Sequence, residues 1–408
     1  MRGELFSGTR SWSMVAVLFG AFVGLTSAAR AQGDVAQIPT MPPAVSNEEV
    51  KPIPTTPTGD GVSQASCSSC GGGLLGSGGG VGGCMGCGSG SGQCSPSRRE
   101  CDCCCSTDTC LGRFVNGLYQ CVCCPDPCYE PRWVALADSA FYTDAARPVT
   151  QMRIRIDQMW DMNSPDRAEY FWAQEGVKGP ARMGPNGTKL PINSIDVSDV
   201  RLYTEAAAGR AGISIDLPYR RIEKDFDASG FADMIIGTKA MLLDCELIQI
   251  TFGFKTYIPT GAPTNGLSTA HVSLEPSLIW ALRLSPSTYL QAQTALFIPI
   301  GGTPAFQGNV FNYSFSLNQM LYKPCNDLKV IGTLELVGWE ILDGSRTDGT
   351  TPSASNSGIE AKTNILSGGP GFRVVICDRI DLGLGSLFAF TNQHWAEEQI
   401  RFDFRWRF

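Results

Sequence analysis

The sequence predicts an all-β protein: an antiparallel transmembrane β-barrel of about twelve strands, preceded by an N-terminal low-complexity segment rich in cysteine and glycine. Three observations predict this fold. Apolar and polar residues alternate with a period of two through the C-terminal part, the alternating stretches run about 10 to 15 residues, and short connections alternate with longer ones. Soluble strands usually have about five or six residues, whereas about 9 to 11 are needed to cross a bilayer at a tilt.

Residues 1–31 are typical of a secretory signal peptide. Arg2 and Arg10 precede an apolar stretch of about fifteen residues, and Ala29 to Ala31 has the small-x-small form of a peptidase site. The apolar stretch is short for a membrane-spanning helix, which needs roughly twenty residues. We therefore expect export and cleavage before Gln32, in preference to an N-terminal membrane anchor.

Two low-complexity segments follow the signal peptide. Residues 32–62 are rich in proline and have little to bury, which predicts an extended tether. Residues 63–128 are rich in glycine and hold 14 of the 17 cysteines. Because few large apolar residues accompany these cysteines, covalent or metal links must replace a hydrophobic core. We expect this segment to be periplasmic.

The cysteine spacing leaves three chemistries open. Cys67, Cys70, Cys84 and Cys87 form two Cys-x2-Cys pairs that could supply four thiolates to one metal ion, as in zinc knuckles. Disulfides are favoured, because an exported chain meets oxidising conditions. Disulfide links to envelope partners are the third alternative. No Cys-x-x-Cys-His sequence occurs, so covalently bound haem is excluded, and we expect no cofactor.

Three further cysteines fall in or beside predicted short turns of the barrel. They are Cys245, Cys325 and Cys377. Short turns face the periplasm in such barrels, so these cysteines are expected on the same side as the cysteine-rich segment and could bond to it.

The barrel itself is predicted at residues 151–408. Residues 129–150 lead into it as a connector, a short helix or a plug that enters the lumen. Connections after even-numbered strands are short, whereas those after odd-numbered strands reach about 36 residues at 163–198 and about 22 at 342–363. Brief periplasmic turns and long outer loops explain this asymmetry, and a soluble β-sandwich does not. The expected strands are 152–162, 199–208, 211–222, 231–243, 246–259, 270–283, 287–300, 309–323, 327–341, 364–377, 379–391 and 396–408.

The chain ends on large apolar residues at alternate positions: Ile400, Phe402, Phe404, Trp406 and Phe408. This ending resembles the C-terminal signature of bacterial outer-membrane barrels, which the barrel-assembly machinery recognises. The resemblance implies the outer membrane of a Gram-negative-type envelope as the location. It also implies two partners, outer-membrane lipid and, through Phe408, the assembly machinery.

A second resemblance covers residues 225–408. The stretch "GFADMIIGTKAMLL", followed by "IQITFGFKTYIPTGAPTNG", resembles the opening of the outer-membrane transporter family named for the MetA pathway of phenol degradation. Asp233, Lys239 and the run 259–261 match its pattern, while Ala232 stands where a second glycine is usual. The resemblance implies a channel-like barrel for passive passage of small aromatic or hydrophobic solutes. The alternative is an envelope-structural barrel that anchors a disulfide-linked network.

Alternation turns charged residues of both signs toward the lumen. Such a mixed interior would be either a wet pore or a lumen cross-linked by ion pairs, and Asp233 and Lys239 could form one such pair. The candidate lumen-lining residues are Arg153, Arg155, Arg201, Glu205, Asp233, Lys239, Lys255, His271, Glu275, Arg283, Glu335, Arg373, Asp381, Arg401, Asp403 and Arg405.

Neither catalysis nor nucleic-acid binding is expected. The net charge of -7 and the pI of about 5.1 argue against a nucleic-acid binder, because no basic stripe is present. His271 and Ser273 have the His-x-Ser spacing of outer-membrane phospholipases, but alternation turns both inward, away from the lipid side. His394 is the only other histidine, so the sequence offers no base, nucleophile and orienter together.

Overall fold

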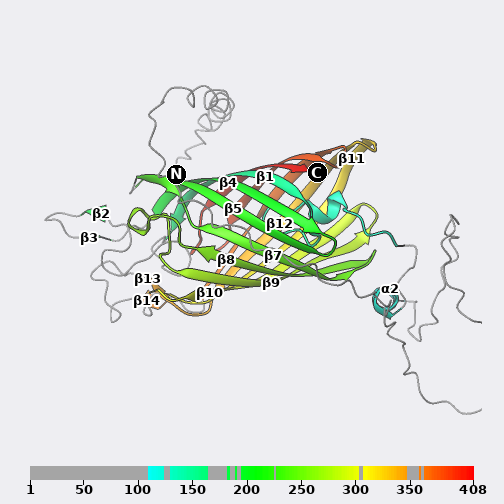
Figure 1. The fold of residues 1–408 in the computed structure, drawn as a ribbon, viewed down its shortest axis with the longest axis horizontal. Helices are drawn as coiled ribbons and strands as arrows, with labels where there is room; N and C mark the ends of the chain where they lie inside the picture. Colours follow the sequence, from blue (N-terminus) through cyan, green and yellow to red (C-terminus); the bar gives the residue numbers. More distant parts are fainter. Residues whose placement is uncertain are drawn as a thin grey trace, which may run out of the picture. The chain divides into compact units, whose positions relative to one another are not determined.

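The fold is that of a computed structural model, which describes residues 109–123, 129–163, 182–183, 189–190, 194–224, 227–302, 307–346, 358–359 and 363–408. Twelve long strands form a closed antiparallel barrel, in which the strands are tilted around a common axis (Figure 1). The strands are β1 (Gln151–Asn163), β4 (Ser194–Ala208), β5 (Ala211–Lys224), β7 (Met234–Asp244), β8 (Ile248–Ile258), β9 (Val272–Ser285), β10 (Thr288–Ile300), β11 (Val310–Cys325), β12 (Leu328–Ile341), β15 (Thr363–Ile376), β16 (Ile380–Ala389) and β17 (Glu398–Arg407).

The predicted twelve-stranded barrel is confirmed, and the largest boundary difference lies at β4. This strand begins at Ser194, five residues before the predicted start at residue 199. In the added stretch the apolar Ile195 and Val197 are buried, whereas Asp196 and Ser198 on the other face are only partly buried. The apolar face is therefore the inner one here, opposite to the rest of the strand, which hides the extension from a search for one continuous alternation.

The barrel closes because β17 pairs with β1. The pairing runs from Gln151 opposite Arg407 to Trp160 opposite Glu398. Every other barrel strand pairs with its neighbours in sequence order. A closed sheet leaves no row of unpaired backbone groups at an edge, which is the condition for a sheet in a lipid environment.

Short elements complete the described fold. They are α2 (Cys110–Cys123), the 3-10 helices η1 (Ala135–Asp138) and η3 (Pro263–Asn265), and the strands β2 (Arg182–Met183), β3 (Lys189–Leu190), β6 (Ala228–Phe231), β13 (Ser345–Arg346) and β14 (Gly358–Ile359). Within the described residues, no helix has the length and apolar character needed to cross a membrane.

The two faces of the wall differ in character. Large apolar side chains are exposed on the outer face, whereas the inner face carries buried polar and charged ones. Since a soluble protein rarely exposes so continuous an apolar surface, the outer face needs a non-aqueous neighbour. Exposed outer residues include Val200, Leu202, Ile213, Ile215, Leu217, Phe252, Phe315, Leu317, Leu334, Phe372, Leu382, Leu384, Ile400 and Phe402.

The two ends of the barrel also differ. One end has the short turns at 209–210, 245–247, 286–287, 326–327 and 377–379, and the opposite end has the longer connections. We call these the short-turn end and the long-loop end.

One disulfide lies at the short-turn end, between Cys121 of α2 and Cys245. Cys121 belongs to the cysteine-rich segment and Cys245 lies in the turn between β7 and β8. Cys123, Cys325 and Cys377 are exposed and carry no disulfide. A covalent bond therefore joins the chain that precedes the barrel to the short-turn end of the wall.

Candidate functional site

Residues 133–147, which we call the plug, lie inside the barrel. They form one turn of 3-10 helix, η1, followed by an irregular run, and most of them are buried. Apolar side chains of the plug pack against the wall: Leu136 against Ile331 and Val375, and Ala146 against Ile279. An eight-stranded barrel is just filled by its own side chains, so a twelve-stranded one has room for such a segment.

The chain enters and leaves the plug at the short-turn end, where Tyr129, four residues before the plug, and Arg147, its last residue, bind the same carboxylate. The Tyr129 hydroxyl donates to Asp244 Oδ1 over 2.9 Å, and Arg147 Nη2 lies 2.5 Å from the same oxygen. Asp244 is the last residue of β7. The segment therefore enters the lumen and returns through one mouth, and it continues directly into β1.

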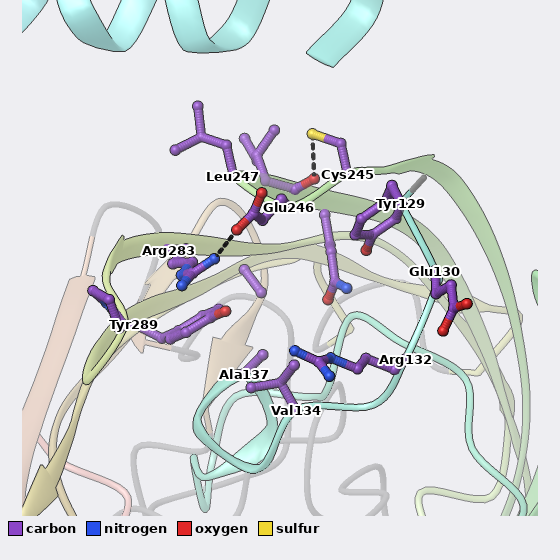
Figure 2. A pocket seen from close by; sticks show the side chains of 14 residues that line it. Tyr129, Glu130, Arg132, Val134, Ala137, Cys245, Glu246, Leu247, Arg283 and Tyr289 are labelled. Atoms are coloured by element: carbon purple, nitrogen blue, oxygen red, sulfur yellow. Dashed lines mark hydrogen bonds and ion pairs between the residues drawn. The ribbon is translucent and has the colours of Figure 1, made fainter. Parts of the chain in front are cut away.

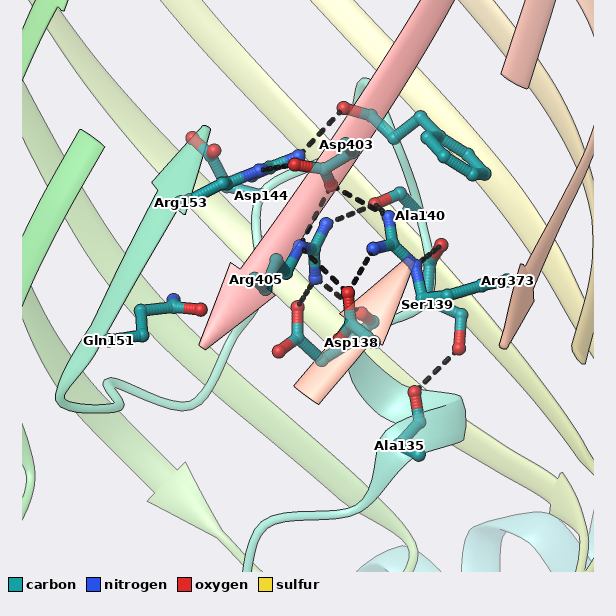
Figure 3. Close-up of polar contacts among 12 residues, drawn as sticks. Ala135, Asp138, Ser139, Ala140, Asp144, Gln151, Arg153, Arg373, Asp403 and Arg405 are labelled. Atoms are coloured by element: carbon teal, nitrogen blue, oxygen red, sulfur yellow. Dashed lines mark hydrogen bonds and ion pairs between the residues drawn. The ribbon is translucent and has the colours of Figure 1, made fainter. Parts of the chain in front are cut away.

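The wall satisfies the backbone of the plug. Arg405 donates to the carbonyl oxygens of Asp138 and Ala140 over 2.7 and 2.9 Å, and Arg401 donates to that of Phe141 over 2.7 Å. Figure 3 shows the guanidinium groups of Arg405 and Arg373 beside residues 138–140. A buried backbone group without a hydrogen-bond partner costs roughly 1–3 kcal/mol. These bonds to the wall remove that cost for a segment that has no regular secondary structure of its own.

The plug amides are satisfied in the same way. Gln291 Oε1 accepts from the amides of Ser139 and Ala140 over 3.0 and 3.1 Å. Glu335 Oε1 accepts from the amide of Phe141 over 2.9 Å, and the Gln293 side chain accepts from that of Asp144 over 2.8 Å. Acceptors come from β10 and β12, whereas the arginine donors come from β15, β17 and β1.

Buried carboxylates hold these arginines in place. Arg405 Nη1 lies 2.7 Å from Asp138 Oδ1, and its Nε lies 2.9 Å from Asp403 Oδ2. Arg153 Nε lies 2.6 Å from Asp403 Oδ1, and Arg373 lies 2.5 Å from Asp381 and 2.9 Å from Asp403. Removing one member of such a buried set leaves an uncompensated charge, which commonly costs 3–5 kcal/mol.

The Phe141 ring fits a socket made of glycines. A Cβ atom added at Gly371, Gly383 or Gly385 would lie 2.6 to 2.8 Å from this ring, which no real Cβ contact tolerates. The guanidinium carbon of Arg373 lies 4.5 Å from the ring centroid and completes the socket. The glycines of β15 and β16 thus leave the space that the Phe141 ring occupies.

A second group of ion pairs lies across the lumen. Lys255 Nζ lies 2.7 Å from Asp144 of the plug and 3.3 Å from Glu275. Lys239 Nζ lies 3.6 Å from Glu205 Oε1. The Thr251 hydroxyl donates to the carbonyl oxygen of Ala146 over 2.5 Å. The plug is therefore bonded on both sides of the barrel.

The structure brings most of the predicted lumen residues together around the plug. Arg153, Lys255, Glu335, Arg373, Arg401 and Arg405 contact it directly, whereas Glu205, Lys239, Glu275, Asp381 and Asp403 pair with one another or with those residues. Arg201 lies apart from the plug and pairs with Asp199 and Asp216 at 3.1 and 3.6 Å. The buried Nε of Arg155 has no hydrogen-bond partner among the described residues.

The expected ion pair between Asp233 and Lys239 is wrong. Asp233 lies in the connection before β7, where its carboxylate accepts from the amides of Gly261 and Thr269 over 3.2 and 3.0 Å. It fixes the connection between β8 and β9 at the long-loop end. The prediction failed because it extended the strand alternation into a residue where β7 has not yet begun.

Two other predicted residues lie away from the plug. Arg283 pairs with Glu246 at the short-turn end. His271 is buried at the long-loop end beside Gly302, with no partner for its Nε2 in the described structure. Ser273 is buried too, and its hydroxyl bonds to no described group, so no His-Ser hydrogen bond links the two. The proposed metal ligands Cys67, Cys70, Cys84 and Cys87 lie outside the described residues.

A cavity of about 410 Å³ lies between the base of the plug and the wall at the short-turn end. Figure 2 shows Arg132 and Val134 of the chain on one side and Arg283 with Glu246 on the other. Tyr289 also lines it. The cavity provides space below the plug, at the mouth through which the plug enters.

The sequence did not reveal several plug partners. Gln291 and Gln293 carry no charge, and Asp138 lies outside any strand, so alternation gave no reason to select them. Gly371, Gly383 and Gly385 have no side chain to attract attention. The signal that could have found them is a run of glycines at every second position on β16, because inward glycines mark a place where another segment approaches.

Charge on the plug is fixed by its surroundings. Burial raises the pKa of Asp138, but the guanidinium groups of Arg405 and Arg407 outweigh burial and lower this pKa from 3.8 to about 2. Burial likewise opposes ionisation of Asp144, yet Lys255 and Lys239 hold its pKa below the usual range. Both carboxylates are therefore ionised at neutral pH.

Of the comparisons with known proteins, only the one with solved structures found similar proteins. No family model matches the sequence, and no protein of curated function matches it. An outer membrane channel from Pseudomonas putida F1 has 12% identity and a TM-score of 0.39, over 69% of this chain and 99% of that chain. The NanC porin has 7% identity and a TM-score of 0.35, over 63% and 98%. LpxR from Salmonella typhimurium has 10% identity and a TM-score of 0.34, over 64% and 100%. Likenesses at this level assign neither a family nor an activity.

Replacing Phe141 by alanine should loosen the plug and leave the barrel folded. The empty glycine socket removes a buried aromatic contact, which typically costs about 3–5 kcal/mol. Limited chymotrypsin digestion followed by mass spectrometry should then show cleavage after Tyr142, inside the plug, which is largely protected in the wild type. Phe388→Ala, on the outer face of β16, is the matched control and should leave this cleavage unchanged. Equal cleavage in both variants would show that the socket does not hold the plug.

Plug docking should weaken as pH falls from about 4 to about 2, where Asp138 becomes protonated. The folded pKa of Asp138 is below its unfolded value, so its stabilisation is complete above the unfolded pKa and is lost as pH falls through the folded one. Pepsin cleavage within residues 133–147 at pH 2 and pH 4 measures this. Asp138→Asn should give at pH 4 the susceptibility that the wild type shows at pH 2. Identical cleavage of both chains at pH 4 would contradict it.

Proposed function

We propose that this protein is an outer-membrane channel held shut by its own plug, which passes small solutes when the plug leaves the lumen. The observation that carries the proposal is that Tyr129, four residues before the plug, and Arg147, its last residue, both bind Asp244 at one mouth. A segment attached in this way can be withdrawn without unthreading the chain. A purely structural filling has no need of this arrangement.

The outer face of the barrel supports a membrane location. Exposed Phe, Leu, Ile and Val side chains surround the wall, while charges are enclosed within it. In water this arrangement would expose apolar surface and bury costly charge, whereas lipid outside a closed barrel makes it favourable. The alternating C-terminal residues up to Phe408 and the export signal support insertion by the barrel-assembly machinery.

The class of solute rests on different observations. The resemblance to the phenol-degradation transporter family supports small aromatic or hydrophobic solutes. At the long-loop end Ile341 and Ile365 of the wall form an apolar cluster with Trp395 of the β16–β17 connection, and Trp339 packs beside it. An apolar entrance above a charged midsection suits solutes with an aromatic body and a polar group.

Replacing residues 134–146 by a short Gly-Ser linker should open the channel. The linker can bridge the gap because both flanking residues lie at the same mouth: the Trp133 ring stacks on Arg407 at the start of the β1–β17 pairing, and Arg147 binds Asp244. In planar bilayers this variant should give a steady ion current, and the wild type should give at least tenfold less at the same number of inserted barrels. A wild type that conducts equally well would refute closure by the plug.

The control for this experiment is an equally long Gly-Ser replacement within the connection 347–360 at the long-loop end. It changes as many residues and leaves the plug in place, so it should stay as silent as the wild type. A folded plug-free barrel that carries no current would refute the channel itself.

A second candidate function is anchoring of the cell envelope, and the bond between Cys121 and Cys245 favours it. This disulfide transmits force from the N-terminal part of the chain to the barrel wall. The exposed thiols of Cys123, Cys325 and Cys377 are accessible for bonds to partners.

Envelope fractions run on non-reducing gels distinguish the two candidates. Anchoring predicts high-mass species that collapse to one monomer band on reduction, and fewer of them in a Cys325→Ser, Cys377→Ser variant. A monomer band that reductant does not change would leave the channel as the better candidate.

A further inference from the structure

The helix α2 carries an apolar stripe that no described residue covers. Leu111, Val115 and Val122 are 71%, 41% and 58% exposed. Their spacing of four and seven residues places them on one side of the helix, together with Leu118, because successive residues are about 100° apart. Exposed apolar surface in this pattern is typical of a helix that lies against a partner.

The opposite part of the helix surface faces the barrel. Cys121 is bonded to Cys245 in the turn between β7 and β8. A Cβ atom at Gly117 would lie 3.0 Å from Leu247 of the same turn, so Gly117 allows the helix to approach closely. Gly117 and Cys121 are one turn apart and mark the wall-facing side. The apolar stripe is centred about 120° away from it, so docking on the barrel leaves the stripe uncovered.

We propose that α2 lies on the periplasmic leaflet of the outer membrane, with this stripe in contact with phospholipid. The inference rests on the proposed membrane location of the barrel. It extends that location to a segment outside the wall and names phospholipid as the partner of the stripe.

Continuity with the outer face of the barrel favours lipid over another protein. Leu242, three residues before Cys245, and Leu284 near the end of β9 are both more than half exposed at the short-turn end. The disulfide holds α2 within a few residues of this apolar margin. The helix also has no acidic residue, so no carboxylate opposes contact with an anionic lipid surface.

The position of α2 has a consequence for the plug. The helix ends at Cys123, and the plug enters the lumen only ten residues later, at Trp133. A helix fixed to the rim by a disulfide and to the leaflet by its apolar stripe limits how far the base of the plug can move. Lipid contact and plug position are therefore connected through one short stretch of chain.

Photo-cross-linking of the full-length chain in vesicles of phosphatidylethanolamine and phosphatidylglycerol tests the proposal. p-Benzoylphenylalanine is placed at Val115, on the stripe, and in a matched variant at Arg113, which is exposed about 160° away around the helix. A third variant carries it at Leu284 on the outer wall, and heat-modifiable gel mobility verifies that each barrel is folded. Mass spectrometry then measures phospholipid adducts at each position.

Position 115 should give at least five times the lipid adduct of position 113 and a yield comparable with that of position 284. Equal yields at 113 and 115 would overturn the inference, and so would adducts from position 115 to a second copy of the chain. Lipid adducts at position 284 with none at position 115 would overturn the inference about α2 and leave the proposed membrane location of the barrel intact. Absence of lipid adducts at 284 would overturn the proposed membrane location, and the inference with it.

Discussion

The internal arrangement of this protein depends on one constraint: an irregular chain buried inside a barrel needs a hydrogen-bond partner for each of its backbone groups. In a helix or a sheet these partners are other backbone groups, whereas residues 138–144 obtain them from side chains of the wall. Arg405 and Arg401 donate to the carbonyl groups, and Gln291 and Glu335 accept from the amides. The sequence of the wall is therefore matched to the backbone of the plug more than to its side chains.

The same constraint explains why the lumen contains so many charges without being strongly cationic or anionic. Arginine donates several hydrogen bonds from one planar group, so it can bind a carbonyl oxygen and a carboxylate together. Arg405 does this with Ala140, Asp138 and Asp403. The plug requires buried guanidinium groups, and each carboxylate beside one of them offsets the free-energy cost of burying its charge. Without the plug, Arg405 retains Asp403, which allows the wall to keep its structure when the lumen opens.

The short-turn end gathers the features that could control the plug. Asp244 binds Tyr129 before the plug and Arg147 at its end, and Cys245 next to it is bonded to α2. The cavity lined by Arg132, Tyr289 and Arg283 lies beside them. Opening would therefore begin at the periplasmic side if the short turns face the periplasm, and the cysteine chemistry of the N-terminal segment would act at the same place. The channel and anchoring functions share this attachment and do not exclude each other.

The sequence by itself determined the wall. Period-two alternation, strand length and the alternation of short and long connections depend only on neighbouring residues, so they predicted twelve strands and the inward direction of Arg373, Arg401 and Arg405. It could not determine which inward charges meet, because that depends on strand register and on the distance across the lumen. The pair proposed for Asp233 and Lys239 failed because Asp233 lies before the start of β7. Nor did it determine the plug. Any short run of residues has the backbone groups that hold residues 138–144, and only the closed barrel, with the glycines around Phe141 and the donors and acceptors of facing strands, decided that this run would be bound inside.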